Sequence, residues 1–205
     1  MVFITRFSAK LASLIRLALL AAFLLAAPFG HAGGIEPQKA VARFSDSHIE
    51  ISSRFSITLS ATLEQALQNG LTLPFQFEFQ LTRPRLYAWA YKLSDWFGPA
   101  ATVTQRLSYQ VLTRQYRVNS GGLSRNFSSL NEALSALGIV SGWQVLSDSS
   151  VVRDSTEFAG RVRLKLDLSQ LPKPYQLAAI GQSEWHLDSP WLELTVASTQ
   201  EAPQS

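Results

Sequence analysis

The stretch TQRLSYQVLTRQYRVNSGGLSRNFSSLNEALSALG, residues 104–138, decides the fold because it joins a strand pattern, a turn and a helix pattern. Apolar and polar residues alternate in its first half and then change face, which predicts one long strand with a β-bulge or a strong bend at residues 111–113. Residues 119–122, Asn-Ser-Gly-Gly, accept positive φ angles and predict a chain reversal.

The second half of this stretch predicts a short amphipathic helix. Ser129 and Glu132 have the spacing of a capping box, in which each side chain accepts a hydrogen bond from a free N–H at the helix start. Apolar residues recur at i, i+3, i+4 and i+7 up to Leu137, and Gly138 is expected to take the left-handed conformation that ends many helices. One face of this helix should therefore pack on a sheet.

The rest of the chain is mainly β in pattern. Thr62 and Gln65 have the spacing of a second capping box, for a two-turn helix that ends at Gly70. Residues 171–174, Leu-Pro-Lys-Pro, predict an extended, polyproline-like link. Further strands are expected at residues 41–44, 49–59, 71–81, 143–146, 162–168 and 185–196. We expect an α+β, β-dominated fold, an antiparallel sheet or sandwich with two short helices packed on it.

Residues 71–81 form the clearest strand pattern of the chain. Leucines and phenylalanines alternate with mostly polar residues, which predicts one dry face and one wet face. Pro74 has no N–H to donate, so the strand should begin there or lie at a sheet edge. Phe75, Phe77 and Phe79 are expected in the core, although a Phe-rich inner face could also enclose a cavity for an apolar ligand.

Residues 1–32 have the features of a secretory signal peptide. Arg6, Lys10 and Arg16 precede the apolar run of residues 17–27, which is too short to span a bilayer as a settled helix. Cleavage is expected between Ala32 and Gly33 and would deliver the protein to the periplasm of a diderm bacterium; an uncleaved signal anchor is the less favoured alternative. The remainder then comprises a single β-rich domain at residues 33–196 and a disordered polar tail at residues 197–205.

Composition excludes several classes of function. The chain has 18 basic and 15 acidic residues, and removal of the signal peptide would leave 15 of each. A domain without net charge is a poor candidate for binding nucleic acid. The absence of cysteine excludes disulfides, thiolate zinc sites and a cysteine nucleophile.

The sequence contains no recognisable catalytic or metal-binding signature. His186, Asp188 and Ser189 supply the residue types of a triad, but no Gly-x-Ser-x-Gly elbow accompanies them. The histidines do not have metal-ligand spacing, and Gly121-Gly122 lacks the helix and lysine of a phosphate loop. We therefore expect no catalytic residues, no cofactor and no metal.

Two groups of residues are candidates for binding. Residues 86–99 are rich in aromatic side chains and follow an Arg-Pro-Arg sequence; they could cover one end of the core or form an exposed surface. The basic stripe Arg161, Arg163 and Lys165 could receive an anionic headgroup or an acidic partner, although a solvated strand face is the commoner explanation. The predicted binding surface consists of Arg83, Arg85, Tyr87, Trp89, Arg114 and Tyr116.

Several motifs together resemble an uncharacterised family of exported proteobacterial proteins, the domain of unknown function 4390 family. They are RLSY at 106–109, LTRQYR at 112–117, SLNEAL at 129–134, LPKP at 171–174 and WHLDS at 185–189. Residues 86–89 are less densely aromatic than the family pattern. The resemblance implies no known activity. Genes of the family often neighbour those of nitrogen-type sensor kinases, which implies an association with envelope signalling.

These observations favour a non-enzymatic periplasmic binding or interaction protein. Its expected partner is an envelope or inner-membrane protein, and it is not expected to bind nucleic acid or to retain a membrane span after cleavage. A carrier of an apolar or lipid ligand is the alternative, which a closed cavity lined by Phe75, Phe77 and Phe79 would favour. A third hypothesis is an envelope hydrolase, which convergence of His186 with an acid and a serine would favour.

Overall fold

The computed structural model describes residues 33–44, 48–82, 101–146 and 159–197. They belong to one compact unit, Ala32–Ser205, separate from Met1–His31. The predicted signal peptide, the aromatic segment at residues 86–99 and residues 198–205 of the predicted tail lie outside the described ranges.

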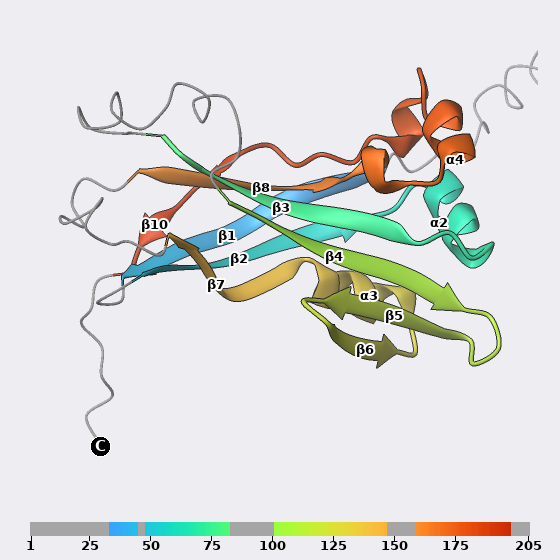
Figure 1. Cartoon of the computed structure of the whole chain (residues 1–205), viewed down its shortest axis with the longest axis horizontal. Coiled ribbons are helices and arrows are strands. Elements are labelled where there is room, and N and C mark those ends of the chain that lie inside the picture. Colours follow the sequence, from blue (N-terminus) through green and yellow to red (C-terminus); the bar gives the residue numbers. More distant parts are fainter. Residues whose placement is uncertain (1–32, 45–47, 83–100, 147–158, 198–205) are drawn as a thin grey trace, which may run out of the picture. The chain divides into compact units, whose positions relative to one another are not determined.

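The described residues form two β-sheets (Figure 1). The four-stranded sheet has the order β10-β1-β2-β7, with β1 at Gly34–Phe44, β2 at Ile49–Thr58, β7 at Ile139–Leu146 and β10 at Thr195–Val196. The six-stranded sheet has the order β6-β5-β4-β3-β8-β9. Its strands are β3 Leu73–Leu81, β4 Ala101–Gln110, β5 Gln115–Ser120, β6 Leu123–Phe127, β8 Gly160–Leu166 and β9 Leu192–Glu193.

The core lies between the two sheets. Phe55 on β2 and Phe77 on β3 pack edge to face with ring centroids 5.9 Å apart, and both side chains are buried. The same cluster includes apolar residues of the helices, among them Leu63, Leu67 and Leu137. The structure confirms the predicted β-dominated α+β fold with antiparallel sheets.

The described ranges contain three short α-helices where the sequence predicted two. They are α2 Ala61–Gln68, α3 Leu130–Leu137 and α4 Lys173–Ala178, and single 3₁₀ turns η3 Leu168–Gln170 and η4 Ser183–Trp185 flank α4. The extended, polyproline-like link expected at residues 171–174 is confirmed for Leu171 (φ −72°, ψ 154°) and Pro172 (φ −55°, ψ 144°), but it is wrong for residues 173–174, which are helical. Pro172 caps α4 and Pro174 lies in its first turn, where a missing N–H leaves no hydrogen bond unmade.

The start of α2 also differs from the prediction. Its N-cap is Ser60, whose Oγ accepts a hydrogen bond from the Leu63 N–H at 3.3 Å, whereas Thr62 lies inside the helix and donates to the Glu184 carboxylate. The predicted end is confirmed, because Gly70 has φ 90°. The Gly70 and Leu71 N–H groups bond to carbonyls of the last turn, as in a Schellman motif.

Helix α3 confirms the predicted apolar stripe and the Ser129 half of the predicted capping box, whereas the Glu132 carboxylate accepts a hydrogen bond from Ser128 Oγ at 3.1 Å. Ser129 Oγ accepts from the Glu132 N–H at 3.3 Å, and the apolar face is buried. The expectation for Gly138 is wrong, since its φ of −72° is right-handed. A Cβ at Gly138 would lie 2.1 Å from the carbonyl oxygen of Phe55, so close approach of β2 explains the glycine.

The long strand predicted across residues 111–113 is two strands. Gln110 on β4 pairs with Gln115 on β5, and the residues between them reverse the chain with Arg114 at φ 53°. This turn lacks glycine, proline and asparagine, which is why it looked like a bend within one strand. The predicted reversal at residues 119–122 is confirmed, with Ser120 paired to Leu123.

Strand β3 begins near Pro74, as predicted, but it lies inside the sheet and not at an edge. It pairs with β4 on one side and β8 on the other. The Pro74 carbonyl accepts from the Asp167 N–H at 2.8 Å, so the residue still takes part in the sheet through its acceptor. The predicted strand at residues 185–196 is mostly irregular and contributes only the two-residue strands β9 and β10.

Candidate functional site

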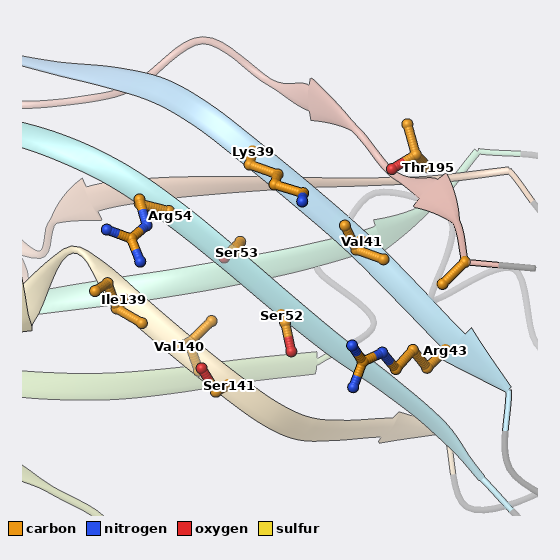
Figure 2. Close-up of a pocket in the computed structure, with 11 residues that line it drawn as sticks. Lys39, Val41, Arg43, Ser52, Ser53, Arg54, Ile139, Val140, Ser141 and Thr195 are labelled. Atoms are coloured by element: carbon orange, nitrogen blue, oxygen red, sulfur yellow. The ribbon is translucent and has the colours of Figure 1, made fainter. Parts of the chain in front are cut away.

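An open groove of about 470 Å³ runs across the outer face of the four-stranded sheet (Figure 2). Lys39, Val41 and Arg43 come from β1, and Ser52 and Arg54 from the neighbouring β2. The groove is bounded by residues 139–141 of β7 on one side and by Thr195 and Ala197 on the other. No carboxylate of the described residues lines it.

Strand alternation explains why the charged side chains point outward. On β2, Ile51, Ser53 and Phe55 are on the buried side, so Ser52 and Arg54 are on the solvent side. A register shift between Pro37 and Lys39 sets the phase of β1. Beyond this shift Ala40 and Ala42 are buried, and Lys39 and Arg43 are exposed.

The register places two cations directly opposite each other. Lys39 pairs with Arg54 in the β1–β2 ladder, and like charges in this position repel. Within the described part of the chain, neither these two residues nor Arg43 makes an ion pair. Glu50 lies opposite Arg43, but its carboxylate is 3.0 Å from His48 Nε2. The groove therefore brings together three cations, and Lys39 and Arg54 have no counter-ion among the described residues.

Hydroxyl groups complete the lining. Ser52 Oγ accepts a hydrogen bond from the Gly142 N–H at 3.3 Å, which leaves the Ser52 hydroxyl proton available to a ligand. Gly142 has φ 63° and lies where the β2–β7 register shifts, so the β-bulge brings β7 toward Ser52. Thr195 Oγ1 donates to the Ala40 carbonyl at 3.0 Å. The cations and the Ser52 hydroxyl together suit carboxylate or phosphate oxygens.

The basic stripe that the sequence singled out has a different environment. Arg163 Nε and Lys165 Nζ lie 2.6 Å and 2.7 Å from the two carboxylate oxygens of Glu78, which is 4% exposed. Arg161 donates two hydrogen bonds to Gln80 Oε1. The guanidinium carbons of Arg161 and Arg163 also lie 4.6 Å and 4.5 Å from the centre of the Trp191 ring. These three cations are paired within the domain.

The predicted binding surface is described only in part. Arg83, Arg85, Tyr87 and Trp89 lie outside the described residues, so their grouping stays a prediction. Strand β4 begins at Ala101, just after that segment, and the turn that carries Arg114 follows the other end of β4.

Tyr116 packs against Tyr109 directly opposite it, with ring centroids 4.9 Å apart. Burial raises the pKa of Tyr116, and Tyr109 and Glu64 add to this effect. Of the two predicted signal-cleavage residues, Ala32 is outside the described ranges. Gly33 lies against Ser60, whose backbone nitrogen would be 2.5 Å from a Cβ at this position.

The serine of the hydrolase hypothesis and the phenylalanines of the carrier hypothesis are buried inside the domain. Ser189 Oγ accepts from the Leu164 N–H at 3.0 Å and donates to the Pro190 carbonyl at 3.0 Å, and it is buried, whereas His186 and Asp188 are exposed. Phe75, Phe77 and Phe79 are fully buried in the core and do not line the groove.

Metal-binding clusters and membrane-spanning helices are both absent from the described ranges. The described ranges hold no cluster of three or more His, Cys, Asp or Glu side chains that could bind a metal ion. None of the helices in these ranges has the length and hydrophobicity of a membrane-spanning segment.

Sequence reasoning missed the groove, although a signal for it was present. Lys39, Val41 and Arg43 occupy every second position of a strand, with apolar residues between them, as Arg161, Arg163 and Lys165 do. What could not be seen was that Lys39 faces Arg54 while Arg163 faces Glu78, because these pairings depend on strand register.

Comparisons with known proteins give one match. No curated protein and no solved structure matches the chain significantly. The profile of a family described as Domain of unknown function (DUF4390) matches residues 32–195, which confirms the resemblance drawn from the motifs. The chain therefore belongs to the DUF4390 family.

Proposed function

We propose that this protein is exported to the periplasm, where it acts as a non-enzymatic binding module that holds an acidic segment of an envelope protein in the groove of Lys39, Arg43 and Arg54. The carrying observation is the pairing of Lys39 with Arg54 without a counter-ion among the described residues. Like charges in direct cross-strand contact destabilise a sheet. A partner that supplies carboxylates would remove this repulsion on binding.

The shape of the groove also supports a macromolecular partner. The groove is open and shallow, which suits an extended segment lying across the strands better than an enclosed small molecule. The neighbourhood of family genes to sensor-kinase genes makes a membrane sensor kinase the partner class to test first. Binding to it would link the domain to envelope signalling.

The test combines crosslinking in living cells with a binding assay. A photo-crosslinking amino acid at Val41 or Ser141, both lining the groove, is expected to capture a membrane protein reproducibly. A fluorescent hexaglutamate peptide serves as the defined probe in vitro. Its affinity should fall at least tenfold in the variant Lys39→Gln/Arg43→Gln/Arg54→Gln and should weaken with added salt.

A matched control separates the groove from net charge. Arg117→Gln/Arg125→Gln/Lys173→Gln removes the same number of cations from exposed or half-buried positions elsewhere and should leave peptide affinity within about twofold. Equal loss in both variants, or no crosslink above that from a position on β6, would reject the groove as the binding site. Native mass spectrometry that finds a retained lipid-like mass would favour the carrier hypothesis instead.

A further inference from the structure

One end of the domain exposes apolar side chains on two protrusions. Five large hydrophobic side chains in the described ranges are exposed, and four of them belong to this end. Val111 and Leu112, 64% and 100% exposed, form the turn between β4 and β5. Leu177 on α4 and Ile180 just after it are 68% and 73% exposed.

The two protrusions lie at the same end of the domain. Figure 1 shows α4 and the β4–β5 turn at the end that also contains α2. Arg106 on β4 donates to Gln170 Oε1, just before α4, at 3.0 Å, and Arg106 and Tyr175 of α4 line one polar groove of about 510 Å³. Both protrusions can therefore meet one flat surface.

The first described residues also lie at this end. Gly34 pairs with Thr58, immediately before α2, and Gly33 lies against Ser60 and Leu187. The sequence before Gly33 contains the apolar run of residues 17–27. This apolar run is therefore covalently connected to the end of the domain that carries the exposed side chains.

We infer that this end of the domain rests on a lipid bilayer, with Leu112, Leu177 and Ile180 entering the interface between headgroups and acyl chains. Exposed aliphatic side chains on protrusions are the usual means of such shallow insertion. Arg114 lies two residues after Leu112, and Lys173 lies one helical turn before Leu177, so each protrusion adds a cation for anionic headgroups.

Carboxylates at this end limit the electrostatic attraction. Thr62 donates to Glu184, Ser169 and Gln170 donate to Asp167, and Glu64 lies near Tyr116. Binding should therefore depend on apolar insertion more than on net charge. This inference does not rest on the proposed groove, which lies on the outer face of the other sheet.

The test uses residues 33–205, whose core is formed by residues 35–187 in a compact unit separate from Met1–His31. Because the chain has no cysteine, single substitutions Leu112→Cys, Leu177→Cys, Ile180→Cys and Leu123→Cys can each carry an environment-sensitive dye. Leu123 is the matched control, since it is 77% exposed but follows the second turn, beyond β5.

With vesicles of phosphatidylethanolamine and phosphatidylglycerol, dyes at positions 112, 177 and 180 should shift to shorter wavelength, and the dye at 123 should not. The unlabelled variant Leu112→Ser/Leu177→Ser/Ile180→Ser should partition onto vesicles at least fiftyfold more weakly, whereas Leu123→Ser should change partitioning less than twofold. Absence of vesicle binding, an equal shift at all four positions, or binding to a membrane protein without lipid would overturn the inference.

Discussion

Two rows of cations on the outer faces of the two sheets look alike in the sequence and differ in the structure. Arg161, Arg163 and Lys165 lie opposite Gln80, Glu78 and Gln76, and the first two also stack on Trp191. In the other row Lys39 lies opposite Arg54. The first row is paired within the domain, whereas Lys39 and Arg54 have no counter-ion among the described residues.

The difference teaches that an alternating basic stripe is not itself a site. The residue opposite each cation, set by register, decides whether the charge is neutralised. Two facing cations without a counter-ion lower the free energy of unfolding slightly. Positions that lower stability in this way are expected to be functional sites.

The largest effect is expected for Glu78→Gln, which turns the paired row into an unpaired one. The substitution leaves Arg163 and Lys165 without a counter-ion, and it should lower the free energy of unfolding by about 1–3 kcal/mol, because both cations keep partial access to water. Urea unfolding at pH 7 measures it. Glu50→Gln, at a partly buried pair with His48 that is more exposed than Glu78, is the control and should cost less than about 1 kcal/mol. Equal losses of stability in the two variants would show that Glu78 stabilises the domain no more than an ordinary surface ion pair does.

Trp191→Ala should have the next largest effect. It removes the ring on which Arg161 and Arg163 stack, with an expected loss of about 1–2 kcal/mol in the free energy of unfolding. Thermal and urea unfolding of this variant beside Trp191→Phe gives the measurement. The phenylalanine variant keeps a ring and should retain part of the stability, and a loss as large as that of the alanine variant would argue against stacking.

Lys39→Glu should raise the free energy of unfolding, whereas the two preceding substitutions lower it. The new carboxylate would face Arg54, so the repulsive pair becomes attractive and the free energy of unfolding should rise by about 0.2–1 kcal/mol. The same change should abolish binding of the hexaglutamate peptide. A variant that is destabilised, or that still binds the peptide, would show that this row is an ordinary solvated surface.

Asp167→Asn should have the smallest effect and a defined dependence on pH. Burial acts to raise the pKa of Asp167, but hydrogen bonds from Ser169 and Gln170, with a smaller contribution from Lys165, outweigh it and hold the pKa below its ordinary value. The carboxylate therefore stabilises the fold above the ordinary aspartate pKa of about 3.9, and this contribution is lost as the pH falls through the lower folded pKa.

Urea unfolding of the wild type and of Asp167→Asn at several pH values from 7 to about 2 checks this expectation. The stability advantage of the wild type should shrink on acidification. An advantage that stays constant or grows would mean that the carboxylate is not held by these contacts.

Local signals in the sequence predicted much of the fold. Alternation predicted β2 and β3, helical spacing predicted the buried face of α3, and Ser129 predicted its cap, because each signal acts between residues close in the chain. The errors fell where local rules allow two outcomes. Residues 111–114 reverse the chain without typical turn residues, and Pro172 and Pro174 begin a helix where they could also have prevented one.

The sequence by itself thus determined where β2, β3 and α3 lie, which of their faces are dry, and that the chain lacks cysteine chemistry. Only the tertiary structure decided which cations are neutralised. Glu78 and Arg163 are 85 residues apart, and their contact requires β3 and β8 to be neighbours in one particular register. Strand order and register arise from burial of the whole core, so no local pattern around Lys39 or Arg54 could reveal that these two charges meet.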